Sequence, residues 1–321
     1  MVEAHSYLCQ LLTVLILIRW KQIKMKRMCF RSLFVIISLS ACSEKELATH
    51  TPEVVATIEN KIEYRFAIHP LHNPTRLFEV FNPLLEYLNH NIQGVNFTLE
   101  ASRDYQTFDN KLKFETVHFA LPNPYQTLIA MEHGYRVIAK MGDDSNFKGI
   151  ILVRKDSQIK KPSDLVGKIV SYPAPTALAA TMLPQYYLHT HGLDINKDIQ
   201  NKYVGSQESS IMNVFLGSTA AGATWPQPWK ALSDERPELK AQLEVIWETQ
   251  SLPNNSVVVR SDISESIANQ VSSLLANLHN TSEGKQILEK MYLSKYEIAD
   301  NETYNSVKLF IDQFNKNIRP L

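Results

Sequence analysis

Cysteine and glycine are scarce in this chain of 321 residues, which holds only three cysteines and ten glycines. All three cysteines (Cys9, Cys29 and Cys42) lie at or before residue 42, so the rest of the chain can form no disulfide, zinc knuckle or thiol nucleophile. The glycine-rich phosphate loops, the G-x-S-x-G elbow and the H-E-x-x-H metal motif are all missing. These absences argue against the common nucleotide-dependent, hydrolytic and zinc-dependent enzymes.

The chain also has no net charge, because its 33 basic side chains balance its 33 acidic ones. The balance is uneven along the chain: residues 1–41 hold six basic groups and one acidic group, which leaves 27 basic against 32 acidic groups in the remainder. A nucleic-acid-binding protein needs a basic face that displaces counterions. The acidic remainder therefore predicts no nucleic-acid partner.

The ten histidines are scattered and form no metal-binding pattern. His189 and His191 are close in sequence, but on a helix their side chains diverge by about 200°. No nucleophile stands beside an obvious base. We therefore expect no catalytic residues, no metal, no cofactor and no enzymatic activity.

Residues 25–42 have the pattern of a secretory signal. Three basic side chains precede an apolar stretch over 32–39 that is far shorter than the roughly 20 residues needed to span a bilayer. Leu39-Ser40-Ala41-Cys42 is similar to the bacterial lipobox, which predicts that Cys42 is lipidated and becomes the mature N-terminus. The alternative is an ordinary signal peptide with an incidental cysteine.

We interpret residues 1–42 as the signal region and the polar residues 43–60 as a tether. The apolar run over 11–18 is also too short to span a membrane, so we expect translation to start at Met25 or Met28 rather than Met1. The expected location is the periplasm, with a lipid anchor in the membrane. Ser43 after the cysteine favours the outer membrane of a Gram-negative cell.

From residue 64 onward, strand-like and helix-like patterns alternate. The first part contains strands over 64–68, 96–100, 117–121, 136–140 and 149–154, and helices over 76–89, 105–112 and 125–133. This rhythm predicts α/β layers around a largely parallel sheet.

A second unit of the same kind begins near residue 155. It contains a turn at 163–165, strands over 168–172, 199–204, 220–224 and 243–249, and helices over 177–191 and 206–216. A strand over 256–260 follows, and we expect the rest to be helical, over 264–279, 283–292 and 302–316. The chain thus divides into lobe 1 (61–148 and 255–321) and lobe 2 (149–254), with a two-stranded hinge near 147–150 and 252–256.

Several motifs in this order resemble one family. They are Phe78 to Leu88, Asp104-Tyr105, Asn123-Pro124-Tyr125, Phe147 to Ser157, Ser163 to Lys168, Gly205-Ser206-Gln207, and Leu252 to Asn255 with Val259-Arg260. The series is similar to the phosphate, phosphite and phosphonate-type periplasmic binding proteins, over about residues 62–315. The resemblance implies an α/β, bilobed type II periplasmic-binding-protein fold.

The resemblance also implies a function. Such a receptor closes on a small ligand between its lobes, here an anionic, phosphonate-like one, and docks on an ABC permease. We expect a monomer. One alternative is a sensing lipoprotein that presents its bound state to a membrane sensor kinase or cyclase. Another is an enzyme similar to the pyrimidine synthases of this receptor class, which the cysteine-free body disfavours.

The resemblance places ten residues at the ligand, and each has a packing or capping role as the alternative. From the first lobe and the hinge they are Tyr105, Asn123, Tyr125 and Phe147; from the second they are Thr176, Ala177, Leu178, Ser206, Gln207 and Trp225. Three positions depart from the family pattern. Ala177 to Ala180 replace a Ser-Thr-Ser-Gly turn, Phe147 replaces a tyrosine and Gln207 replaces a histidine. Trp225 offers an aromatic wall to the ligand, whereas Trp229 is expected in the core.

Overall fold

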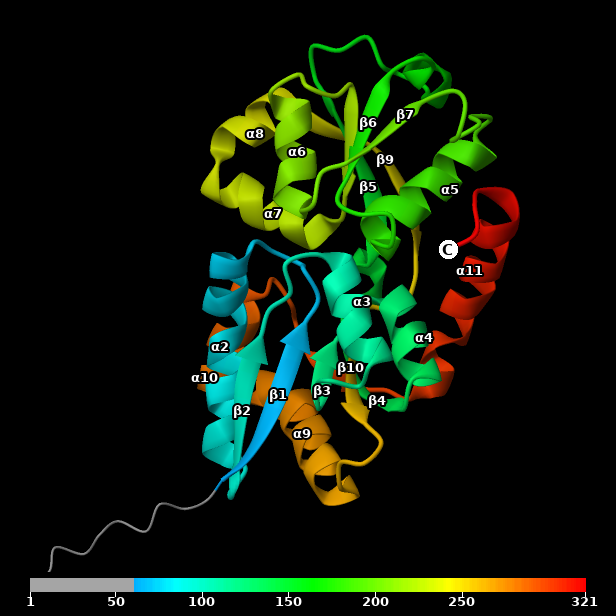
Figure 1. Ribbon diagram of the computed structural model, residues 1–321. Helices are drawn as coiled ribbons and strands as arrows, with labels where there is room; N and C mark the ends of the chain where they lie inside the picture. The colour runs from blue at the N-terminus through cyan, green and yellow to red at the C-terminus, as the bar shows by residue number, and fades with distance from the viewer. Residues whose placement is uncertain (1–60) are drawn as a thin grey trace, which may run out of the picture. The chain divides into compact units, whose positions relative to one another are not determined.

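The computed structural model describes residues 61–321, which form two sheets flanked by helices (Figure 1). The predicted signal region, Cys42 and the tether lie outside these residues. We call the six-stranded sheet with its helices the first lobe, and the five-stranded sheet with its helices the second lobe. None of the described helices combines the length and hydropathy that crossing a bilayer requires.

The first lobe has the strand order β11-β4-β10-β3-β1-β2. The strands are β1 (Ile62–Ile68), β2 (Val95–Glu100), β3 (Phe119–Leu121), β4 (Tyr135–Met141), β10 (Ser256–Arg260) and β11 (Tyr296–Ile298). Its helices are α2 (Pro74–Asn91), α3 (Tyr105–Lys113), α4 (Pro124–Glu132), α9 (Glu265–Asn277), α10 (Ser282–Lys290) and α11 (Asn305–Asn317).

The second lobe has the strand order β7-β6-β8-β5-β9. The strands are β5 (Lys148–Arg154), β6 (Ile169–Tyr172), β7 (Gln200–Tyr203), β8 (Ala221–Thr224) and β9 (Leu243–Ser251). The helices are α5 (Leu183–Thr190), α6 (Gln207–Phe215), α7 (Pro226–Glu235) and α8 (Pro237–Gln242), and short turns cover Asp144–Asn146 and Pro162–Leu165. One turn of π-helix, Leu178–Met182, leads directly into α5.

The prediction of a largely parallel sheet is wrong, because both sheets are mixed. Strand β1 pairs in parallel with β2 and β3, and β6 does so with β7 and β8. In contrast, β10 runs antiparallel to β3 and β4, β11 to β4, and β5 to β8 and β9. Two neighbouring parallel strands need a crossover connection between them, usually a helix. Strands β5 and β10 instead each follow a strand of the other lobe, so each runs antiparallel to its neighbours in the sheet that it joins.

Three local expectations also failed. Helices α7 and α8 were not predicted, because Pro226 and Pro237 suggest a break, yet each occupies the first helical turn, where proline is tolerated. Strand β11 was not predicted either: it lies between the helices expected over 283–292 and 302–316, and its three residues are too few to show a period. The helix expected over 177–191 begins with the π-turn.

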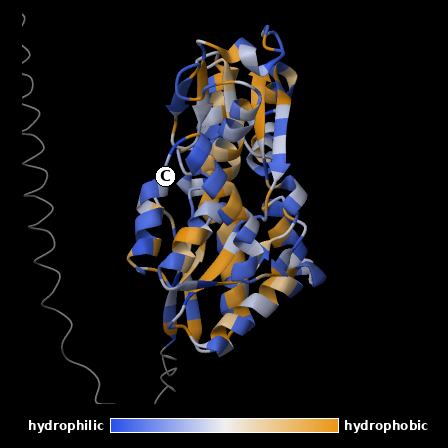
Figure 2. Cartoon of the chain, turned by 90° about the vertical axis from the view of Figure 1, so that its right-hand side faces the viewer, coloured by the Kyte–Doolittle hydropathy of each residue, from blue (hydrophilic) through white to orange (hydrophobic). Residues whose placement is uncertain are grey.

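The apolar core follows the strands (Figure 2). The larger buried cluster includes strand side chains from both lobes, such as Phe66 and Val258 in the first and Val170 in the second. A smaller cluster joins Leu152, Ile211, Val214, Leu239 and Leu243 beneath α6 and α8. Helix ends are set locally: the Asn73 side chain accepts a hydrogen bond from the Arg76 amide and caps α2.

Two segments run between the lobes, 142–147 after β4 and 252–255 after β9, and we call them the crossing segments. They are bonded to each other and to β4. The Leu252 amide donates to the Phe147 carbonyl at 3.1 Å, and the Asn254 side chain donates to the Gly142 carbonyl at 2.7 Å. Helix α11 also bridges the lobes, because Tyr186 of α5 donates to Gln313 at 3.3 Å. The lobe limits given in residues above stay a prediction.

Candidate functional site

The crossing segments, the strand ends of the first lobe and three helix beginnings of the second lobe meet around one small cavity. Its volume is about 10 Å³, close to what a single water molecule requires. The groups that line it are His69, Tyr105, Asn123, Phe147, Ala177, Leu178, Ala179, Ala180, Gln207, Trp225 and Asn255.

Seven of the ten predicted contact residues therefore lie together at this cavity. The other three, Tyr125, Thr176 and Ser206, do not line it. Tyr125 is half-buried against the core, Thr176 offers its carbonyl to the Asn123 side chain at 3.1 Å, and Ser206 caps α6 by accepting from the Ser209 amide at 3.1 Å. A ligand-binding role for each of the ten stays a prediction.

His69 forms part of the first-lobe wall and was not among the predicted contacts. Its Nδ1 lies 2.9 Å from the Leu121 carbonyl oxygen, which can only accept, so Nδ1 carries the proton. The other ring nitrogen is then an acceptor. Burial lowers the pKa of His69 to about 4, with His72 contributing further, so the ring is neutral near pH 7. The sequence signal was its place directly after a strand.

Tyr105 and Gln207 connect the two lobes across the cavity. Thr224 donates to Gln207 Oε1 at 2.8 Å, which fixes the amide so that its NH₂ group faces Tyr105, with Nε2 at 3.5 Å from the hydroxyl oxygen. Burial raises the pKa of Tyr105 well above its usual value, so the phenol keeps its proton. Both side chains are therefore neutral groups that can donate a hydrogen bond.

The second-lobe wall is the π-turn, and its geometry follows from Pro184. A proline ring clashes with the carbonyl four residues earlier in a regular helix, and the wider turn just before Pro184 avoids this. The Met182 amide accordingly reaches back to the Ala177 carbonyl at 3.2 Å. The amides of residues 178–180 stand at the beginning of the helix, where no intrahelical acceptor exists. They are the main-chain donors on this side of the cavity.

Phe147 and Trp225 form an aromatic corner between a crossing segment and α7. Their ring centroids lie 5.4 Å apart at an interplanar angle of 63°, an edge-to-face arrangement. Each side chain is only 2% exposed. Trp225 thus lines the cavity from within the core. Trp229 is half-buried against the smaller apolar cluster, away from the cavity.

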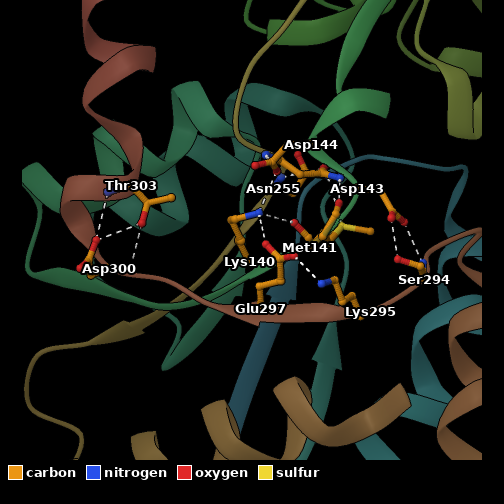
Figure 3. A network of polar contacts seen from close by, with 12 residues as sticks. Lys140, Met141, Asp143, Asp144, Asn255, Ser294, Lys295, Glu297, Asp300 and Thr303 are labelled. Carbon is orange, nitrogen blue, oxygen red and sulfur yellow. Dashed lines mark hydrogen bonds and ion pairs between the residues drawn. The ribbon is translucent and has the colours of Figure 1, made fainter. Parts of the chain in front are cut away.

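Asn255 was also missed, although it lies in the second crossing segment and is fully buried. The sequence placed Asn254 and Asn255 in the hinge but did not predict a ligand contact for either. The available sequence signal for such a contact was the pair of polar side chains in a segment that passes between the two lobes. Beside them, Lys140 is largely buried between Asp144 at 2.8 Å and Glu297 at 2.7 Å (Figure 3). Burial alone would lower the pKa of Lys140, but hydrogen bonds to both carboxylates raise it, so the ammonium stays charged.

Further contacts between the lobes lie away from the cavity, around the N-terminal part of α2. His72 Nδ1 lies 3.4 Å from Glu208 Oε1, and Arg76 pairs with Glu235. Burial would raise the pKa of Glu208, but the contact with His72 holds it below its usual value. A wide groove of about 1220 Å³ runs beside these pairs and is lined by both acidic and basic side chains. Within residues 61–321, no cluster of His, Cys, Asp or Glu side chains could hold a metal ion.

A family model described as "ABC transporter, phosphonate, periplasmic substrate-binding protein" matches residues 66–304. The chain belongs to this family. Its members are substrate-binding proteins rather than enzymes, and the family is periplasmic. The resemblance noted in the sequence motifs is therefore confirmed.

Two relatives and one solved structure show how distant the similarity is. A probable phosphite-binding protein of an ABC transporter from Prochlorococcus marinus is 24% identical over an alignment of 193 residues, and the alignment covers 56% of this chain and 65% of that relative. A phosphonates-binding periplasmic protein from Escherichia coli is 22% identical over 268 residues, 80% of this chain and 78% of that relative.

The structure of a Prochlorococcus marinus protein in complex with methylphosphonate is 19% identical, with a TM-score of 0.73 over 79% of this chain and 98% of that one. At this identity the likeness shows the fold alone. The fold prediction, a bilobed type II periplasmic binding protein, is confirmed.

Proposed function

We propose that this chain is the solute-binding lipoprotein of an ABC importer, and that it captures a small anionic, phosphonate-like ligand between its lobes. The observation that supports this most is the cavity itself. Side chains from the first lobe, the second lobe and both crossing segments converge on one buried point. A ligand there would touch both lobes at once and would therefore favour their closed arrangement over any open one.

The donors around the cavity suit an oxyanion. The π-turn presents main-chain amides at the beginning of a helix, and Gln207, Asn123 and Tyr105 add side-chain donors. Among residues 61–321, no lysine or arginine lines the cavity. The relatives named as phosphonate- and phosphite-binding proteins support the same ligand class.

The remaining parts of the proposal concern the cell envelope. Cys42 carries the lipid, residues 43–60 tether the protein, and the monomeric receptor delivers its ligand to a permease in the inner membrane. The outer membrane is the anchoring membrane if the cell is Gram-negative.

The cavity has a volume of about 10 Å³ and holds one water molecule, so a ligand enters only when the lobes separate. A ligand that binds only the folded protein raises its melting temperature. Full-length protein in detergent should therefore melt at a higher temperature with phosphite, phosphate or methylphosphonate. No shift with any of the three would contradict the proposed ligand class.

A pair of tryptophan variants tests whether the cavity is the site. Trp225→Ala removes the cavity's aromatic corner and should weaken binding at least about tenfold, which corresponds to 1.4 kcal/mol. Trp229→Ala is the matched control, because Trp229 lies in α7, just after the N-cap residue Trp225 and the prolines that follow it, and its removal leaves the cavity lining unchanged. Equal affinities in both variants and the wild type, measured by calorimetry, would place the binding site elsewhere.

A further inference from the structure

Asn255 has one polar atom that the fold leaves without a partner. Its amide donates to Asn254 Oδ1 at 2.8 Å, and its carbonyl accepts from the Met141 amide at 2.8 Å. The side-chain nitrogen lies 3.5 Å from the Met141 sulfur (Figure 3). A thioether sulfur can only accept, so the NH₂ group faces Met141 and Oδ1 points the other way. Oδ1 is buried and makes no hydrogen bond.

This oxygen belongs to a side chain that lines the cavity and is 0% exposed. A buried acceptor without a partner is costly, and native structures rarely keep one without a reason. His69 adds a second acceptor to the same cavity, because its Nδ1 donates to Leu121 and its Nε2 keeps a lone pair. Asn255 Oδ1 and His69 Nε2 are thus two acceptors on side chains that line the cavity, and the π-turn that lines its other side has amides without an intrahelical acceptor.

A ligand that satisfies both sides needs oxygens that accept and at least one O–H that donates. Given the proposed function, on which this inference rests, we propose that the cavity selects an oxyanion that keeps one proton, a singly charged phosphonate or phosphite, whose P–OH donates to Asn255 Oδ1. Its unprotonated oxygens accept from the amides of residues 178–180. A sulfonate has the same shape and charge but no O–H, so it would bring an anionic oxygen against an acceptor.

The charged groups near Asn255 do not change this assignment. Tyr304 donates to the Asn254 carbonyl at 2.5 Å, and Asp144 accepts from the Asn254 amide at 3.0 Å while it pairs with Lys140. Tyr304 and Asp144 contact the crossing segment at Asn254, Lys140 contacts Asp144, and none of the three lines the cavity. Among the lining groups only His69 and Tyr105 titrate, and both are neutral between about pH 5 and pH 9. The proton that decides binding therefore belongs to the ligand.

The test compares methylphosphonate with methanesulfonate by calorimetry on the full-length protein in detergent. At about pH 6 a large share of the phosphonate keeps one proton, so the two probes differ mainly by that proton. The wild type should prefer methylphosphonate by about 10- to 100-fold, the range expected when a buried acceptor loses its partner. Raising the pH to about 8.5 should weaken methylphosphonate binding and leave methanesulfonate binding unchanged.

Two variants locate the effect. Asn255→Leu removes the acceptor at similar volume and should bring the preference close to one. Tyr172→Phe is the matched control, because the Tyr172 hydroxyl is also buried without a partner but Tyr172 lies in β6 and does not line the cavity, so this variant should keep the wild-type preference. If Asn255→Leu does not fold, the wild-type preference and its pH dependence decide the question.

The outcomes separate this inference from the function on which it rests. Equal affinities of the wild type for both probes would overturn the selection of a protonated oxyanion and leave the receptor function standing. A preference that Asn255→Leu retains would overturn the role of Asn255. No binding of methylphosphonate, methanesulfonate, phosphite or phosphate would overturn the proposed ligand class, and the inference with it.

Discussion

A single methyl group added at Gly149 should displace the second-lobe wall. It lies in β5 just after the crossing segment, and its amide donates to Thr249 Oγ1 at 2.8 Å. A Cβ atom there would lie 2.5 Å from the Ala179 carbonyl oxygen and 2.6 Å from Pro184 Cδ. Neither neighbour is the end of a flexible side chain, so Gly149→Ala must push the π-turn away from β5.

The size of the effect follows from this crowding. Overpacking a well-packed core typically costs 1–3 kcal/mol, and two contacts with rigid groups place Gly149→Ala at the upper end, about 3 kcal/mol. For a domain of this size, each kcal/mol lowers the melting temperature by about 2–4 °C, so we expect a decrease of roughly 6–12 °C. Because Ala179 lines the cavity, displacement of the π-turn should also weaken ligand binding.

Thermal unfolding followed by circular dichroism measures the first effect, and calorimetry with methylphosphonate measures the second. Gly217→Ala is the control. Gly217 has a φ of +72° with no atom near the added Cβ, so this variant should lose about 1 kcal/mol through backbone strain and keep its affinity. If Gly149→Ala has the same melting temperature as the wild type, β5 and the π-turn do not pack as closely as the structure indicates.

Three further predictions concern charge, anchoring and motion. Burial raises the pKa of Asp109 to about 6, above its unfolded value of about 4, so its contribution to stability is full below pH 4 and is lost as the pH rises through 6. Asp109→Asn should therefore gain roughly 1–3 kcal/mol over the wild type at pH 8 and nothing at pH 4, and an equal gain at both would contradict this. Cys42→Ser should release the protein from membranes or leave its precursor uncleaved, and unchanged membrane fractionation would rule out the lipid anchor. In small-angle scattering, saturating ligand should reduce the radius of gyration; an identical radius in both states would argue against closure.

The elements that could be predicted are those whose signals are local. Helix α2 shows an apolar stripe at helical spacing and an asparagine cap, and both are visible within 20 residues of sequence. The direction of strand pairing has no such signal. Whether β10 lies parallel or antiparallel to β3 depends on how the chain returns from the other lobe, more than 130 residues later.

The site shows the same division. The resemblance to the family placed Tyr105, Asn123 and Gln207 near the ligand, and in the structure each lines the cavity at the beginning of a helix that follows a strand. His69 and Asn255 were not predicted, because their roles depend on which of their atoms remain unpaired after folding. Asn255 in particular looks like its neighbour Asn254 in the sequence. Their contacts in the structure distinguish them: the Asn254 side chain bonds to the Gly142 carbonyl and holds the crossing segment, whereas Asn255 lies against Met141 and lines the cavity.

The contacts that hold the lobes together suggest why a ligand can control them. The pairs Arg76–Glu235 and His72–Glu208 lie away from the cavity. The first is partly exposed, and an exposed ion pair contributes only about 0–1 kcal/mol; the second is largely buried, with side-chain exposures of 9% and 18%. Within the cavity, the Gln207–Tyr105 contact is long, at 3.5 Å, and Asn255 Oδ1 is left unpaired. Under the proposed function, a ligand that supplies the missing donor would satisfy this acceptor only while both lobes contact the ligand. This difference in free energy is what a receptor needs for its closure to report occupancy.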